Sequence, residues 1–148
     1  MAAPKGNKFW ESRSSHGRNP EFKNPEEMWT CASEYFQWVE DNPLLEEKGF
    51  AFHGVVTKEK FNKMRAMTAQ GFCNFLGITT RTWRGYRDRE DFIPVMEMIE
   101  QVMFAQKFEG ASADLLNGSI IARELGLADK QEVVGGISLT INQDDAEL

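Results

Sequence analysis

The chain has 148 residues, about the length of one domain, and a composition of 41% apolar and 27% charged residues that is typical of globular proteins. No run of about 18 apolar residues is present, and the first residues lack the apolar stretch of a secretory signal, so we expect neither a membrane span nor export. Two cysteines and two histidines are too few for a disulfide scaffold or a four-ligand zinc cluster. These counts predict a protein of the reducing cytoplasm that holds no metal or cofactor.

The net charge of −6 is unevenly distributed along the chain. Residues 58–89 contain eight Lys or Arg against two acidic residues, whereas residues 90–148 contain three against twelve. A basic block of this kind can contact the phosphates of a nucleic acid. The alternative is a solvated surface whose charges have no such partner.

Residues 1–24 form a polar arm interrupted by a few aromatic residues. Asn24 and Pro25 then predict a helix start, and apolar residues at helical spacing extend this helix to about Asp41. Alternation around Gly54 over residues 50–57 predicts a small β-hairpin, with His53 on its surface. Residues 58–67 fit either a helix or an extended connection.

The most specific pattern is a helix-turn-helix over residues 68–88. Thr68 is the expected cap of the first helix, Gly77 lies at the turn, and Thr79 or Thr80 caps the second helix. The inward positions hold apolar or small residues, namely Phe72, Cys73, Leu76, Ile78, Trp83 and Tyr86. Arg81, Arg84 and Arg87 remain on the outward face of the second helix.

These features give a set of candidate DNA contacts. The set comprises Lys58, Lys60, Lys63, Arg65, Thr80, Arg81, Arg84 and Arg87. Arginine suits this role because its guanidinium group bonds phosphates and base edges in a bidentate manner. The alternative is a packed helical pair whose arginines bridge to acidic residues of a neighbouring subunit.

The rest of the predicted helical core, residues 25–128, contains two helices expected within residues 90–125. One runs from Pro94 to about residue 108, Gly110 interrupts it, and a second antiparallel helix follows over residues 111–125 with Gly126 as its stop. Met96, Ile99 and Met103 lie on an apolar stripe that fits either the core or an interface between subunits. We take them as candidate oligomerisation residues.

A strand pattern follows over residues 129–142, where Ile137, Leu139 and Ile141 alternate with polar residues. A single strand cannot satisfy its own backbone, so copies from neighbouring subunits are expected to form a small β-barrel. Residues 143–148 form an acidic tail. The predicted fold is therefore mainly α, with a helix-turn-helix, a helical hairpin, a small β-hairpin and a C-terminal barrel strand in a ring oligomer.

No motif for catalysis is found in the sequence. A Gly-x-x-x-x-Gly-Lys-Ser/Thr phosphate loop, a Gly-x-Ser-x-Gly elbow and paired helical histidines are all missing. Cys31 and Cys73 occupy positions expected to be buried, which disfavours a nucleophilic role. The sequence predicts a binding and assembly protein and no enzyme.

Several longer segments resemble a known family, the small terminase subunits, or DNA-packaging proteins, of short-tailed headful-packaging bacteriophages. The resemblance covers roughly residues 1–130. It is carried by the segments at residues 2–7, 9–11, 13–20, 63–68, 83–84, 86–87, 106–108, 114–117 and 120–123.

This resemblance implies a ring with a central channel, with nine copies as the expected number, a helical body and a β-barrel collar. Such a ring recognises the packaging site on concatemeric viral double-stranded DNA and recruits the large terminase subunit, which supplies the ATPase and nuclease. It implies action in the host cytoplasm and absence from the mature virion. Similar proteins end in a basic tail, whereas this chain ends in an acidic one, so DNA contact is expected at residues 58–89 or on the arm.

Two other functions fit the same sequence. A dimeric helix-turn-helix transcription regulator would bind palindromic half-sites about 34–36 Å apart. A structural ring of the virion, such as a portal-neck adaptor, would be found in mature particles.

Overall fold

The computed structural model describes residues 6–11 and 21–128. The elements in chain order are η1 (Phe9–Glu11), α1 (Pro25–Asp41), β1 (Leu44–Phe52), β2 (Val55–Lys63), α2 (Ala69–Leu76), α3 (Thr80–Gly85), η2 (Tyr86–Asp88), α4 (Ile93–Ser112) and α5 (Gly118–Glu124). This part of the chain is mainly helical with one two-stranded hairpin, as predicted. None of its helices combines the length and apolar character needed to cross a bilayer. The predicted barrel strand, the acidic tail and much of the arm lie outside the described residues.

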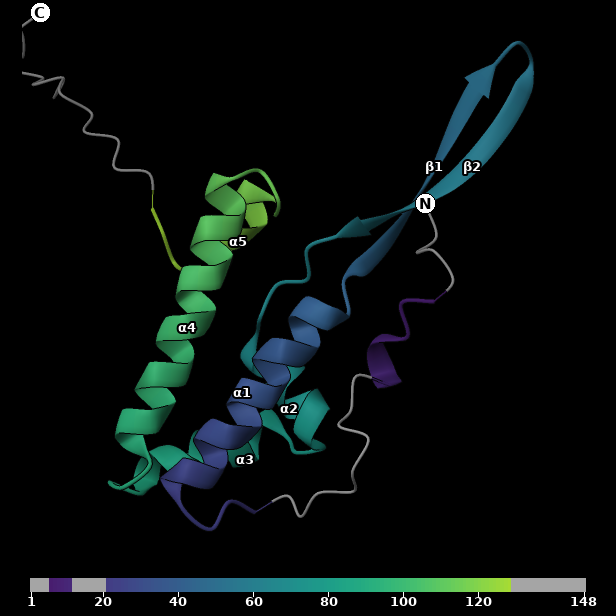
Figure 1. Cartoon of the computed structure of the whole chain (residues 1–148). Coiled ribbons are helices and arrows are strands. Elements are labelled where there is room, and N and C mark those ends of the chain that lie inside the picture. Colours follow the sequence, from purple (N-terminus) through teal and green to yellow (C-terminus); the bar gives the residue numbers. More distant parts are fainter. Residues whose placement is uncertain (1–5, 12–20, 129–148) are drawn as a thin grey trace, which may run out of the picture.

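Helix α1 begins and ends where the sequence predicts. The Asn24 side chain accepts a hydrogen bond from the Glu27 amide at 2.8 Å, and Pro25 occupies the first turn. Its apolar stripe is buried against α2 and α4. The core so formed contains Met28, Cys31, Tyr35, Phe72, Phe92, Met96 and Ile99 among its most deeply buried residues. Figure 1 shows α1 and α4 coming together at the end where α3 lies, with α2 beside α1.

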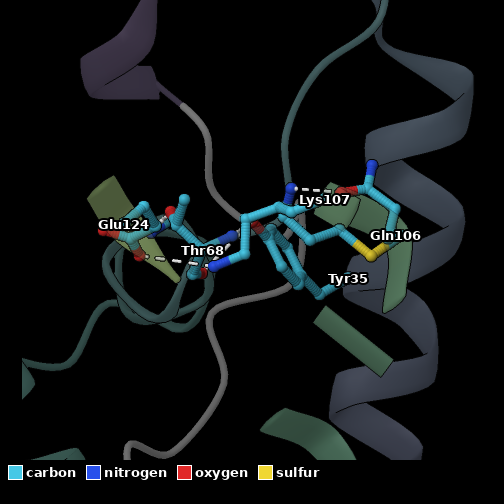
Figure 2. A network of polar contacts seen from close by, with 7 residues as sticks. Tyr35, Thr68, Gln106, Lys107 and Glu124 are labelled. Carbon is cyan, nitrogen blue, oxygen red and sulfur yellow. Dashed lines mark hydrogen bonds and ion pairs between the residues drawn. The ribbon is translucent and has the colours of Figure 1, made fainter. Parts of the chain in front are cut away.

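The linker at residues 64–68, between β2 and α2, is held from two sides. The Tyr35 hydroxyl accepts a hydrogen bond from the Thr68 amide at 3.2 Å and donates one to the Thr68 carbonyl at 3.4 Å. From α4, the Gln106 side chain accepts from the Met67 amide and donates to the Arg65 carbonyl, each at 2.9 Å. Figure 2 shows Tyr35 and Gln106 reaching this linker. The Gln106 amide thus pairs with the linker as a neighbouring strand would, which satisfies backbone groups that no sheet covers.

The end of α4 differs from the prediction. The helix continues through Gly110 to Ser112, and α5 spans only Gly118–Glu124, so the expected pair of long antiparallel helices is wrong. Gly110 is buried, and a side chain there would lie 2.8 Å from atoms of Met64 and Leu116. Glycine at this position permits close packing and does not break the helix. The chain turns later, where Asp114 adopts a φ of 57°.

Helix α5 is attached to α4 by a partly buried ion pair. The Lys107 ammonium lies 3.3 Å from the Glu124 carboxylate, and the Lys107 side chain is buried (Figure 2). The Asn117 side chain caps α5 by accepting from the Ile120 amide at 3.0 Å. Gly126 has a φ of 69°, consistent with the predicted helix stop at that residue.

The β-hairpin is longer than predicted and projects away from the helices (Figure 1). Its strands pair from Leu44 with Lys63 to Phe52 with Val55, so residues 58–63 are extended. The turn places His53 and Gly54 at φ values of 49° and 77°, the positive values that a tight two-residue hairpin turn requires. At the base, the Asn7 side-chain amide exchanges two hydrogen bonds of 3.0 Å with the Leu45 backbone.

Replacing Gln106 with Glu should destabilise the protein by about 1–3 kcal/mol, because a carboxylate cannot donate to the Arg65 carbonyl and two acceptors would then face each other. Urea unfolding at fixed protomer concentration measures this loss. Equal stability of wild type and Gln106→Glu would show that the linker is not held in this way.

Two glycine substitutions should differ in their effect. A side chain at Gly71 would lie 2.5 Å from the Tyr35 hydroxyl, which its bonds to Thr68 hold in place. At Gly110 the neighbours are the flexible ends of Met64 and Leu116. We expect Gly71→Ala to lower the free energy of unfolding by about 1–3 kcal/mol, and Gly110→Ala to lower it distinctly less, in the same urea experiment. The reverse order would contradict this account of the core.

Candidate nucleic-acid interface

Helices α2 and α3 form the predicted helix-turn-helix. The Thr68 hydroxyl caps α2 by accepting from the Gly71 amide at 2.9 Å, and Thr79 caps α3 by accepting from the Thr82 amide at 3.2 Å. Gly77 has a φ of 77°, the left-handed conformation expected at the turn. Helix α3 is only six residues long and continues as the 3-10 turn η2. The cap of α3 is therefore Thr79, which leaves Thr80 as its first residue.

The predicted inward side chains of this motif pack in the core. Phe72, Cys73, Leu76, Trp83 and Tyr86 are buried, and Ile78 is partly buried against them. The Phe72 and Trp83 rings meet edge to face with centroids 5.3 Å apart. The Tyr86 hydroxyl accepts a hydrogen bond from the Phe22 amide at 3.0 Å, which ties the segment before α1 to the motif. The orientation of α3 is thereby fixed.

Sequence reasoning missed one inward residue, Phe75. It is buried, and its ring lies 5.6 Å from that of Tyr35 and 5.8 Å from that of Trp38. The signal was the width of the apolar face of α2, where Phe72, Phe75 and Leu76 are spaced three and four residues apart. This face is wide because α2 contacts α1 as well as α3.

Arg81 and Arg84 are the cations that α3 presents to solvent. Arg81 is exposed and has no hydrogen-bond or ion-pair partner among residues 6–11 and 21–128. Arg84 is exposed and bonds only to Thr80 within the same described ranges, at 3.3 Å to its carbonyl and 3.4 Å to its hydroxyl. Both guanidinium groups therefore face outward without an acidic partner in the described part of the chain. They are suited to phosphates or base edges.

The other arginines near α3 are already engaged. Arg87 forms an ion pair with Glu100 of α4, and this contact raises the pKa of Arg87. The Arg89 guanidinium lies over the Phe92 ring, 4.5 Å from its centroid. The structure therefore separates Arg87 from Arg81 and Arg84, with which the sequence had grouped it.

The remaining candidate DNA contacts lie on the hairpin and the linker, far from α3 (Figure 1). Lys58 and Lys60 are exposed on β2. Lys63 pairs with Glu46 at 3.0 Å, and this contact lowers the pKa of Glu46. Arg65 lies over the Trp38 ring and donates to the Asn42 carbonyl at 2.7 Å. The basic block of the sequence thus becomes two separate surfaces.

Comparison with known proteins identifies the family. The family model of the DNA-packaging protein gp3 matches residues 17–133. The terminase small subunit of Salmonella phage P22 is 57% identical over 133 residues, which cover 90% of this chain and 82% of that protein. The chain belongs to the gp3 DNA-packaging family. The resemblance to small terminase subunits is confirmed, and it assigns the chain a role in DNA packaging.

The candidate oligomerisation residues of this packaging protein fall in two places. Met96, Ile99 and Met103 are buried within the single chain, so they are core residues and a neighbouring copy cannot reach them. Ile137, Leu139 and Ile141 lie outside the described residues. The exposed apolar residues of the same helix are Met98, Phe104 and Phe108. Sequence periodicity could not separate these sets, because α4 is apolar on both sides.

Neither cysteine is suited to nucleophilic chemistry in the described structure. Cys31 and Cys73 lie in the core and are not joined in a disulfide, and burial raises the pKa of Cys73 to about 11. Within the described ranges, no three His, Cys, Asp or Glu side chains are grouped so that they could hold a metal ion.

The buried thiol makes stability depend on pH. The ordinary pKa of 9.0 is raised to about 11 in the folded state, so the folded protein keeps a proton that the unfolded chain loses. Stability should therefore fall as pH rises from 9 to about 11, by at most about 2–3 kcal/mol from this group. Burial also raises the pKa of Tyr35, which acts in the same direction.

Urea unfolding between pH 8 and pH 11 checks this, with Cys73→Ala as the comparison. The free energy of unfolding of Cys73→Ala should fall less over this pH range than that of the wild type. The fall that remains in the variant should be the contribution of Tyr35. Parallel curves for the two proteins would show that Cys73 does not contribute.

Proposed function

We propose that this chain is a non-catalytic small terminase subunit that recognises the packaging site on concatemeric viral DNA. In this proposal it assembles as a ring, with nine copies as the expected number, and recruits the large terminase subunit, whose ATPase and nuclease start genome packaging. It acts in the host cytoplasm and is absent from the mature virion. The family and the relative in phage P22 support the packaging role.

The observation that carries the DNA-binding part is the outward face of α3. Arg81 and Arg84 extend from the second helix of a helix-turn-helix, the helix that such motifs place in the major groove. The buried rings of Trp83 and Tyr86 fix the opposite side of this segment. The two cations are thus held at the surface by packing on a rigid core and are not on a mobile loop.

Assembly is needed because one copy presents few free cations. Non-specific binding of duplex DNA by a single basic module is weak, on the order of 10⁻⁴–10⁻⁶ M at physiological salt. Several copies of α3 on one ring would bind the same duplex with a much higher effective affinity. The second apolar face of α4, with the stacked rings of Phe104 and Phe108 exposed, supports an interface between copies.

Removing both outward arginines should weaken DNA binding. We expect Arg81→Ala with Arg84→Ala to lower affinity for duplex DNA and to reduce the salt slope by about 0.9 for each phosphate that the variant no longer neutralises. The matched control is Arg87→Ala with Arg123→Ala, which removes the same charge from a residue paired with Glu100 and from one on α5. This control should bind nearly as the wild type does.

Fluorescence anisotropy titrations at several salt concentrations measure both quantities. If the Arg81 and Arg84 double variant binds like the wild type, α3 is not the DNA-binding surface. Protection of a palindromic site in a footprinting experiment would instead support a dimeric transcription regulator.

A further inference from the structure

Helix α3 ends in a glycine on its exposed side. Gly85 lies one helical turn after Arg81 and next to Arg84, on the side opposite the buried rings of Trp83 and Tyr86. Gly85 and both arginines are exposed. The outward face of α3 therefore consists of two arginines and a position that carries no side chain.

The fold of the described residues gives no reason for glycine at this position. Gly85 has φ and ψ of −62° and −25°, the ordinary right-handed conformation that any residue adopts. A Cβ atom there would have no neighbour within 4 Å in the described part of the chain. Gly85 thus differs from Gly77, whose φ is positive, and from Gly71 and Gly110, where a neighbour would lie 2.5 Å or 2.8 Å from such an atom. Glycine destabilises a helix relative to alanine, because it loses more conformational freedom on folding.

The surface around Gly85 is open. The Arg84 side chain turns back to Thr80, whose carbonyl and hydroxyl oxygens accept its hydrogen bonds. Beside Gly85, an open groove of about 290 Å³ is lined by Glu21, Phe22, Thr82, Gly85, Tyr86 and Arg89. A ligand can therefore lie directly against the backbone of α3 at this residue.

The charges around Gly85 favour a DNA strand on the side of Arg81 and Arg84. These two cations lie within the turn before Gly85 and have no acidic partner in the described ranges. The nearby acidic residues lie elsewhere: Glu21 shares the groove with Arg89, and Asp88, Glu90 and Asp91 follow Gly85 in the chain. Phosphates are thus attracted to α3 up to Gly85 and repelled beyond it.

We propose that Gly85 is a DNA-contact position, where one strand of the bound duplex lies directly against the backbone of α3. The missing side chain brings the strand within reach of both guanidinium groups, which bond phosphates and base edges only at short distance. A side chain at residue 85 would hold the strand away from the helix and lengthen both arginine contacts. Glycine is the residue that permits such close approach of a backbone to a ligand. This inference rests on the DNA-binding role proposed for α3 and names a further residue of that surface.

Substitutions at Gly85 should change stability and DNA binding in opposite directions. Alanine and leucine favour a helix more than glycine does, so Gly85→Ala and Gly85→Leu should unfold at a urea concentration equal to or above that of the wild type. Their affinity for duplex DNA should fall with side-chain size. We expect a several-fold loss for alanine and a loss of about tenfold or more for leucine, as for the loss of one bidentate arginine contact. Urea unfolding and fluorescence anisotropy of the full chain measure the two effects.

Gly118 provides the matched control. It is an exposed helical glycine at the start of α5, and among the described residues nothing lies within 4 Å of the position of its Cβ atom. Helix α5 lies at the other end of α4 from α3 (Figure 1). Gly118→Ala and Gly118→Leu should leave DNA binding unchanged. Native mass spectrometry should show the same assembly for the wild type and all four variants, so that a loss of affinity does not reflect a loss of copies.

The outcomes separate this inference from the proposed function. Wild-type affinity of Gly85→Leu, together with weaker binding by the Arg81 and Arg84 double variant, overturns the contact at Gly85 and leaves α3 as the DNA-binding surface. Wild-type affinity of both proteins overturns the proposed surface and this contact together. Lower stability of Gly85→Ala would assign the glycine to the fold, and smaller assemblies of the Gly85 variants would assign it to contacts between copies. Either result, or an equal loss of binding in the Gly118 variants, overturns the inference.

Discussion

Hydrogen bonds from Tyr35 of α1 and Gln106 of α4 hold the linker at residues 64–68. The placement of both the hairpin and the helix-turn-helix depends on these bonds. The linker has no sheet or helix of its own to satisfy its peptide groups. A tyrosine hydroxyl and a glutamine amide supply that pairing from opposite sides, so the linker is as constrained as a strand. The hairpin therefore leaves the helical core in a defined direction, and α2 begins at a defined residue, Thr68.

The packing of the helix-turn-helix on the core explains why few of its cations are free. Because the packing of Trp83 and Tyr86 fixes the orientation of α3 and η2, the arginines of residues 81–89 cannot all face one way. Arg87 turns to Glu100 and joins the motif to α4, and Arg89 lies over an aromatic ring of the core. Among the arginines of residues 81–89, Arg81 and Arg84 face outward and contact neither an acidic side chain nor an aromatic ring of the described residues. With two such cations, one subunit would bind DNA weakly. In the proposed function, several subunits contact the same duplex, which raises the effective affinity.

Local signals predicted much of the fold. Asn24 and Pro25 marked the start of α1, Thr68 and Gly77 bounded α2, and the buried positions of the helix-turn-helix were identified from spacing. The predicted helix break at Gly110 was wrong. A glycine that ends a helix and a glycine that allows close packing of Met64 and Leu116 cannot be distinguished in the sequence. The sequence could not show which candidate DNA contacts are free and which are already bound within the chain. Arg87 pairs with Glu100 of α4 and Arg65 lies over Trp38 of α1, and these partners are distant in the sequence. Because α4 is apolar on two sides, the sequence likewise could not show which side packs in the core.

A cryo-electron microscopy map of the protein bound to a duplex that contains its packaging site tests the central claim most directly. The account predicts several copies in one assembly, with the outer face of α3 against the DNA and Arg81 and Arg84 at phosphates or base edges. A duplex bound elsewhere, with α3 exposed to solvent in every copy, would contradict it.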